Sequence, residues 1–324
     1  MSKSRLVLGV DVGGTNTVFG LVDKSGNIFL NDSIPTNADQ SAENLFSRLF
    51  EKFHKLSEDA RDDFELAGIG IGAPNANYYK GTIENPPNLN WGFVDVVKLI
   101  EKFSNVPVAL TNDANAAALG EMYYGVAKEF KNFIVITLGT GLGSGIVVNG
   151  NLLYGHDGFA GEIGHTIYDS NGRQCGCGRK GCLETYVSAP GIKRTVMELI
   201  ARTNIKSRLR SISYESLDAK MITNAALAGD ELALEAFDFT ARVLGLKLAD
   251  SVAHTSPEAI ILFGGLANAG DLLLIPTKKY LEENLFHVFK NKVKILKSEL
   301  NEGKAAVLGA AALIWHELDK QSAS

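Results

Sequence analysis

DVGGTNT at residues 11–17 and GTGLGSG at residues 139–145 are the two glycine-rich stretches that decide the fold of this chain. Each lies between two apolar runs, a pattern that predicts a strand, a turn and a second strand. The runs are residues 5–10 and 18–22 around the first stretch, and 133–138 and 146–148 around the second. We infer that one device occurs twice and predict two similar α/β domains, although two unrelated glycine-interrupted hairpins would also look alike.

Length and composition narrow the class of protein. The chain has 324 residues, which favours two domains, and its 32 Lys and Arg against 37 Asp and Glu give a net charge of −5. This balance excludes a strongly basic nucleic-acid-binding surface. The apolar run before Asp11 is too short for a signal peptide, and the longest apolar stretch, 305–315, is about half a membrane span. We therefore expect a cytoplasmic protein that binds neither nucleic acid nor membrane.

Helical periodicity and short apolar runs predict the remaining elements. Helices are expected at 41–56, 93–103, 114–124, 187–202, 219–227, 231–254, 272–285 and 305–318, and strands at 28–34, 66–71, 106–110, 259–263 and 293–296. No proline- or serine-rich linker separates the domains, so we expect the chain to pass between them more than once. We predict a small α/β domain from residues 1–112 and 305–324, and a large α/β domain with the cysteine-rich loop from residues 113–304.

Both glycine stretches have the composition of phosphate-binding turns. Glycine lets backbone N–H groups approach an anion, and threonine hydroxyls add donors. Asp11 would repel a bare phosphate but would hold a Mg²⁺ that bridges phosphates. A structural turn is the alternative for either stretch alone, whereas two such stretches favour a polyphosphate clamp. A P-loop motif is absent, and the G-x-G-x-x-G at residues 176–181 follows no predicted strand, which argues against a dinucleotide site.

Asn112 and Asp113 follow a predicted strand and begin a predicted helix, where α/β proteins bind ligands. A carboxylate there accepts the proton of a hydroxyl as its oxygen attacks a phosphorus atom. Asn and Asp are also preferred helix N-caps, so a structural role is the alternative. Polar side chains that suit sugar hydroxyls, although such residues are often only solvated, occur at Asn88, Glu162, His165 and Glu184.

The three cysteines of the chain, Cys175, Cys177 and Cys182, follow His165 closely. Three clustered thiols and an imidazole match the Cys₃His set of a structural zinc site. Three thiolates and Zn²⁺ together carry a charge of −1, which nearby cations would offset: Arg173, Arg179 and Lys180. Free buried cysteines, a redox sensor, and His156 as the fourth ligand are the alternatives.

Five runs of the sequence resemble the ROK family (repressor, open reading frame, kinase). They are DVGGTNT at 11–17, ENPPNLNW at 84–91, NDANAAALGE at 112–121, TLGTGLGSGIVVNGNLLYGHDGFAGEIGH at 137–165 and CGCGRKGCLE at 175–184. The likeness extends over nearly the whole chain and, within the family, is greatest to bacterial ATP-dependent glucokinases. It implies an actin-like, hexokinase-type (ribonuclease H-like) fold of two α/β domains, with ligands in an interdomain cleft and a homodimeric assembly.

The resemblance also implies roles for matching residues. It implies Mg²⁺ and ATP phosphates at Asp11, Gly13, Gly14, Thr15, Asn16, Thr17, Thr140, Gly141, Gly264 and Gly265. It implies sugar contacts at Asn88, Asn112, Asp113, Glu162, His165 and Glu184, with Asp113 as the catalytic base. It implies a structural Zn²⁺ held by His165, Cys175, Cys177 and Cys182, so that His165 would serve the zinc, the sugar or both. Asn75 stands where the family often has glycine, which leaves the sugar selectivity more open.

We therefore predict an enzyme that phosphorylates the 6-hydroxyl of glucose with Mg·ATP. The nearest alternatives are kinases for N-acetylglucosamine, N-acetylmannosamine, mannose or fructose, and polyphosphate is the alternative phosphate donor. A sugar-responsive transcriptional regulator of the same family is the alternative from another class. Such regulators carry an N-terminal helix-turn-helix domain, whereas here the first glycine turn begins at Asp11, so we expect the kinase.

Overall fold

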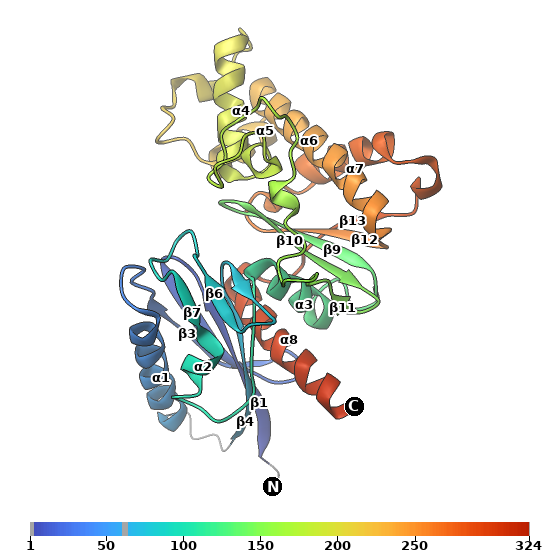
Figure 1. Cartoon of the computed structure of the whole chain (residues 1–324). Helices are drawn as coiled ribbons and strands as arrows, with labels where there is room; N and C mark the ends of the chain where they lie inside the picture. The colour runs from blue at the N-terminus through green and yellow to red at the C-terminus, as the bar shows by residue number, and fades with distance from the viewer. Residues whose placement is uncertain (1–2, 60–63, 324) are drawn as a thin grey trace. The chain divides into compact units, whose positions relative to one another are not determined.

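The computed structural model describes residues 3–59 and 64–323 (Figure 1). The chain divides into two compact units. Unit 1 comprises Met1–Glu129, Leu152–Ala160 and Glu299–Ser324, and unit 2 comprises Phe130–Asn151 and Gly161–Ser298. A five-stranded sheet of mixed direction is the centre of each unit. The predicted pair of α/β domains is therefore confirmed.

The sheet of unit 1 has the strand order β3-β2-β1-β4-β8. Its strands are β1 (Ser4–Val12), β2 (Asn16–Val22), β3 (Ile28–Pro35), β4 (Phe64–Gly72) and β8 (Val108–Thr111). β1 is antiparallel to β2 and parallel to β4, which is parallel to β8. At the shared carboxyl edge Asp11 pairs with Gly72, and Gly72 pairs with Thr111. This register places Asp11 on the same sheet edge as the segment that leads to Asp113.

Helix α8 packs closely against the sheet of unit 1 and against α3. The helices of this unit are α1 (Ala42–Asp59), α2 (Val96–Ile100), α3 (Asp113–Tyr124) and α8 (Glu302–Ala323). A Cβ atom on Gly70 would lie 1.8 Å from the carbonyl oxygen of Ala310, and one on Gly309 would lie 2.5 Å from that of Ala116. These two glycines therefore serve the packing of α8 rather than a ligand.

The unit boundaries differ from the predicted ones at 112/113 and 304/305. Helix α3 belongs to unit 1, where it packs against α8. Residues 152–160 also belong to unit 1, where the ring of Tyr154 stacks on that of Tyr78 with centroids 4.0 Å apart. The chain passes between the units more than once, as the lack of a linker predicted.

The sheet of unit 2 repeats the topology of the first, with the order β11-β10-β9-β12-β13. Its strands are β9 (Phe133–Leu138), β10 (Leu142–Val148), β11 (Asn151–Leu152), β12 (Ala259–Phe263) and β13 (Lys294–Lys297). β9 is antiparallel to β10 and parallel to β12, which is parallel to β13. The two sheets thus share one pattern of a hairpin followed by two parallel neighbours. This confirms the predicted repeat at the level of topology.

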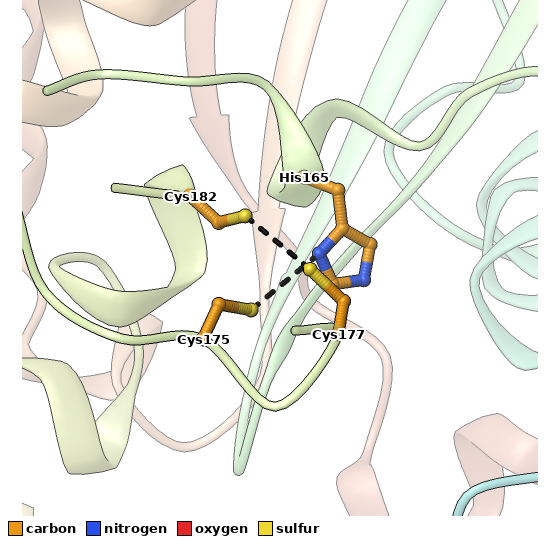
Figure 2. A group of neighbouring side chains, drawn as sticks. All are labelled: His165, Cys175, Cys177 and Cys182. Carbon is orange, nitrogen blue, oxygen red and sulfur yellow. Dashed lines mark hydrogen bonds between the residues drawn. The ribbon is translucent and has the colours of Figure 1, made fainter. Parts of the chain in front are cut away.

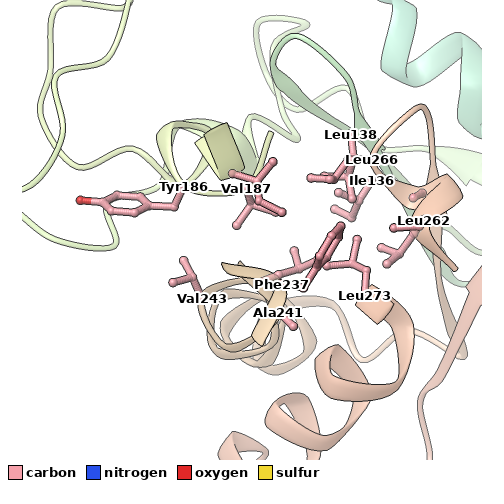
Figure 3. Packing of buried hydrophobic residues seen from close by; sticks show 14 of the residues in the cluster. Ile136, Leu138, Tyr186, Val187, Phe237, Ala241, Val243, Leu262, Leu266 and Leu273 are labelled. Carbon is pink, nitrogen blue, oxygen red and sulfur yellow. The ribbon is translucent and has the colours of Figure 1, made fainter. Parts of the chain in front are cut away.

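The core of unit 2 fixes the end of β9, from which the second glycine turn departs. Its helices are α4 (Ala189–Arg202), α5 (Ala219–Leu227), α6 (Glu231–Thr255) and α7 (Asp271–Asn284), with short 3-10 turns η1 (Ile163–His165), η2 (Leu183–Thr185), η3 (Arg208–Ser211), η4 (Ala267–Ala269) and η5 (His287–Phe289). Figure 3 shows Phe237 of α6 among the buried hydrophobic side chains of this core, with Leu138 of β9, Leu262 of β12 and Leu273 of α7 nearby. Each of these four side chains is almost completely buried.

The structure differs from the predicted elements in two places near the candidate site. The helix predicted at 93–103 is instead β7 (Phe93–Asp95) followed by α2, because the Asp95 carboxylate accepts the N–H of Lys98 and begins the helix only there. Residues 142–145 belong to β10, so the second glycine turn is limited to residues 139–141. Two short strands, β5 (Ala76–Asn77) and β6 (Thr82–Glu84), form a small sheet with β7 and were not predicted.

Membrane-spanning segments were also sought. Within residues 3–59 and 64–323, every helix is too short or too polar to cross a bilayer.

Candidate active site

The first glycine turn, residues 13–15, connects β1 to β2 in unit 1. The N–H of Gly13 donates to the Asn16 carbonyl at 3.1 Å, and the turn exposes the side chains of Thr15 and Asn16. Burial and the neighbouring Asp113 carboxylate raise the pKa of Asp11 to about 7. Two carboxylates in a partly desolvated site repel each other, and a divalent cation relieves that repulsion. The turn and Asp11 together are suited to a metal-bound polyphosphate.

Asp113 lies at the first position of α3, and Asn112 caps this helix. The Asn112 side chain accepts the N–H of Asn115 at 2.7 Å, while Asp113 accepts the N–H of Ala114 at 2.8 Å. The Asp113 side chain reaches solvent, and the protein packed around it still desolvates the carboxylate enough to raise its pKa. Because Asn112 performs the capping, Asp113 is not needed for that purpose and remains a candidate base.

The first turn touches Asn88 but holds Thr17 away from any ligand. A Cβ atom on Gly14 would lie 2.8 Å from the Cβ of Asn88, whose side chain is exposed. Thr17 is fully buried, and its hydroxyl pairs with that of Thr36 at 2.9 Å. The Thr36 hydroxyl donates to the Gly13 carbonyl at 2.7 Å. Thr17 therefore supports the turn from within the core, which the alternation with buried Phe19 along β2 would have indicated.

The second glycine turn lies beside Gly264 and Gly265 at the carboxyl ends of β9 and β12. Gly264 has φ +97°, and a Cβ atom there would lie 2.8 Å from the Leu138 carbonyl oxygen. The N–H of Leu266 donates to the same carbonyl at 3.1 Å. The structure thus places Gly264 and Gly265 beside the second glycine turn, as expected if both contact the nucleotide. Thr140 is exposed at the tip of that turn.

Glu184 lies between the second turn and the cysteine cluster, a contact that sequence reasoning missed. Its Oε2 accepts the N–H of Leu142 at 3.3 Å, and a Cβ atom on Gly141 would lie 2.8 Å from that oxygen. Its Oε1 accepts the thiol of Cys175 at 3.1 Å and lies 3.9 Å from Nδ1 of His165. One carboxylate therefore touches both predicted sites of unit 2.

Ser144 of β10 is a residue of this region that sequence reasoning missed. Its buried hydroxyl accepts the N–H of Ile163 at 3.2 Å and donates to the Gly161 carbonyl. These bonds hold the segment that carries Glu162, which is exposed, and His165. Nothing in the sequence distinguishes Ser144 from its neighbours, because it lies in a stretch that reads as a ligand-binding turn.

Figure 2 shows His165, Cys175, Cys177 and Cys182 directed toward one another. Their ligand atoms all lie within 4.8 Å of one another. Cys177 Sγ is 3.6 Å from Cys182 Sγ, and Cys175 Sγ is 3.8 Å from His165 Nδ1. Tetrahedral zinc with Zn–S bonds of about 2.3 Å separates its sulfur ligands by about 3.8 Å, so the set fits this ion. His165, and not the alternative His156, completes the group.

The charges around this cluster differ from those predicted. Hydrogen bonds from Arg179 and from the other thiols outweigh the opposing effect of burial and lower the pKa of Cys177 to about 6. Burial raises the pKa of Cys175 and of Cys182. Arg173, expected to offset the thiolate charge, pairs instead with Glu198 at 2.9 Å. Arg179, also predicted to offset this charge, does hydrogen-bond to Cys177.

The structure brings the predicted residues together as two groups, one in each unit. Asp11, the first turn, Asn88, Asn112 and Asp113 lie in unit 1. The second turn, Glu162, Gly264, Gly265, Glu184 and the Cys₃His cluster lie in unit 2.

Comparisons with known proteins identify relatives over most of the chain. The model of the ROK family matches residues 7–317. A glucokinase of Halalkalibacterium halodurans is 39% identical over 286 residues, which cover 86% of this chain and 86% of that protein.

Two solved structures resemble the chain along most of its length. A ROK family glucokinase from Streptomyces griseus, in complex with glucose and AMPPNP, is 33% identical with a TM-score of 0.78, covering 95% of this chain and 98% of that one. A ROK family transcriptional regulator, a homologue of the E. coli MLC protein, is 28% identical with a TM-score of 0.87, covering 97% of this chain and 78% of that one. The first likeness confirms the predicted kinase-type fold. The chain belongs to the ROK family.

Proposed function

We propose that this protein is a sugar kinase that transfers the γ-phosphoryl group of Mg·ATP to the 6-hydroxyl of glucose. The observation that carries the proposal is the placement of Asp113 in unit 1. It follows β8 at the sheet edge where Asp11 lies near the end of β1, it is relieved of helix capping by Asn112, and the two carboxylates interact. The glucokinase relatives supply the substrate class.

In this proposal Asp113 accepts the proton of the sugar hydroxyl as its oxygen attacks the γ-phosphorus. The raised pKa of Asp113 makes it a better proton acceptor than an ordinary carboxylate. Asp11 would hold Mg²⁺, which neutralises charge on the phosphates when bound. The backbone N–H groups of the two glycine turns would bind the phosphate oxygens. Rate enhancement then comes mainly from positioning and charge neutralisation.

The residues proposed to hold the sugar are Asn88, Asn112, Glu162, His165 and Glu184. Amide and carboxylate groups suit a ligand whose hydroxyls both donate and accept hydrogen bonds. A structural Zn²⁺ on His165 and the three cysteines would fix the segment that carries these contacts. Elemental analysis of the purified protein tests the metal, and a preparation without zinc contradicts that assignment. A homodimer in the cytoplasm remains our expectation.

A coupled assay over a panel of hexoses and phosphate donors tests the activity. Glucose with ATP should give the highest kcat/KM, whereas a preference for an N-acetylhexosamine, mannose, fructose or polyphosphate would reassign the substrate. The higher TM-score to the regulator favours one further candidate, a sugar-binding regulator without kinase activity. Sugar binding with no turnover of any hexose would support that function instead.

The base is tested with Asp113→Asn and a matched control. This variant should lower kcat by at least about 100-fold while sugar binding is largely kept. Asp95→Asn is the control, because Asp95 also begins a helix of unit 1 and asparagine caps equally well. Near-normal turnover of Asp113→Asn would exclude Asp113 as the base.

A further inference from the structure

Arg173 has a fully hydrogen-bonded side chain near the cysteine cluster, and no role in the proposed reaction accounts for it. Its side chain is only 9% exposed. All five of its N–H donors are used. Nε and Nη2 each donate to an oxygen of Glu198 at 2.9 Å, Nη2 donates to the Thr195 hydroxyl at 2.9 Å, and Nη1 donates to the carbonyls of Thr185 at 2.8 Å and Gly191 at 3.0 Å.

The guanidinium also stacks on the ring of Tyr186, the residue that follows η2. The central carbon of the guanidinium lies 4.5 Å from the centroid of this ring. The Tyr186 hydroxyl accepts the backbone N–H of Arg173 at 3.0 Å. At the other end of the cysteine loop, the Arg173 carbonyl accepts the N–H of Gly181 at 2.7 Å. Arg173 thus joins both ends of the cysteine loop to η2 and to α4.

We propose that Arg173 is a positioning residue that, with Glu198, fixes η2 against α4 and so sets the place of the Glu184 carboxylate. Thr185, whose carbonyl Arg173 binds, follows Glu184 directly. The Glu184 carboxylate contacts Cys175 on one side and Leu142 of the second turn on the other. A shift of η2 therefore displaces a sugar contact and loosens the cysteine loop together. The sugar part of this inference rests on the proposed function.

Arg173→Met tests the proposal, with Arg194→Met as the matched control. Arg194 lies on α4 and bonds the same loop, but through a single 3.3 Å hydrogen bond to the Gln174 carbonyl. We expect Arg173→Met to raise the KM for sugar about tenfold and to change kcat and the KM for ATP by less than about threefold. The control should stay within about twofold of wild type.

A second readout does not depend on kinase activity. The rate at which a disulfide reagent modifies the three cysteines of the purified protein should rise several-fold in Arg173→Met and not in Arg194→Met. If wild type phosphorylates no hexose, the proposed function fails, whereas this rate still tests the attachment of the loop. Equal rates in the two variants would overturn the proposal.

Two milder variants separate positioning from general stability. Arg173→Lys keeps the charge but lacks the planar fork, so its sugar KM should lie between those of wild type and Arg173→Met. Glu198→Gln leaves Arg173 in place and should shift the sugar KM in the same direction by about threefold, which also provides a test if Arg173→Met does not fold. A wild-type KM for sugar in Arg173→Lys would refute the inference, and so would an unchanged KM for sugar in Glu198→Gln. An equal change in every kinetic constant of Arg173→Met would refute it as well, because that points to a general loss of stability.

Discussion

The two glycine turns occupy the same position in two sheets of the same topology, but their carboxylates come from different places. In unit 1 the carboxylate is that of Asp11, which is the second-last residue of β1 to pair with β2. The corresponding residue in unit 2 is Thr137, the second-last residue of β9 to pair with β10. Thr137 has no carboxylate, and its hydroxyl accepts the N–H of Gly143 at 3.1 Å. The carboxylate beside the second turn belongs to Glu184, from a later segment. Repetition of the topology therefore conserves backbone geometry and leaves side-chain chemistry free to differ.

The largest effect that this comparison predicts is for Asp11→Asn. An amide in place of the carboxylate would no longer hold the cation on the phosphates, so kcat should fall by about 100-fold or more at saturating Mg·ATP. Steady-state kinetics give the value. Asp23→Asn is the control, since the Asp23 carboxylate accepts hydrogen bonds from Ser25 and Asn27 of its own hairpin turn, away from the glycine turns. If kcat of Asp11→Asn falls by less than about threefold, the Asp11 carboxylate does not hold the cation, and the first turn is not distinguished from the second in this way.

The pH dependence of Asp11 is the next test. Its pKa of about 7 lies above the ordinary value of 3.8, so the folded protein keeps this proton between about pH 4 and pH 7 while the unfolded chain has lost it. Asp11 therefore lowers stability as pH rises through that range. The Tm of Asp11→Asn, measured relative to that of wild type, should therefore increase as the pH is raised from 5 to 8. Mg²⁺ competes with the same proton, so the Mg²⁺ concentration for half-maximal activity should rise about tenfold from pH 7 to pH 5.5.

A smaller effect is expected from Glu184→Gln. Glutamine keeps the size of the side chain and can still accept the N–H of Leu142, so the second turn should stay in place. The KM for sugar should rise about fivefold, and kcat should change less than it does in Asp11→Asn. Initial-rate measurements with each substrate varied in turn separate the two constants. A loss of kcat equal to that of Asp11→Asn would show that the two acids do the same work.

The smallest effects are predicted for two threonines that support the turns. Thr17→Val removes the hydroxyl that pairs with Thr36, and Thr137→Val removes the acceptor of the Gly143 N–H. Each substitution should lower the free energy of unfolding by about 1 kcal/mol and leave kcat within about threefold of wild type. Thermal unfolding and the kinase assay provide the two values. A large loss of activity in Thr17→Val would mean that its hydroxyl serves the ligand after all.

The sequence predicted most of the fold because apolar residues follow the helical or strand period over nearly every element. It predicted the metal cluster because cysteine spacing is informative, and Figure 2 shows the four side chains together. It failed at residues 93–103, where an internal N-cap, Asp95, divides a strand from a short helix. It also missed the contact of Glu184 with Leu142, because no local pattern relates two residues that tertiary packing brings together.

The discontinuity of unit 1 has a consequence for the order in which the chain folds during synthesis. During synthesis β1 and β4 leave the ribosome before unit 2 does, but their covering helix α8 follows unit 2 in the sequence. Every residue of unit 2 emerges before α8 does. The first unit to begin is therefore the last to be completed, and its half-covered sheet must wait in the nascent chain. A protein truncated before α8 would expose that sheet permanently and would be a natural target for chaperones and proteases.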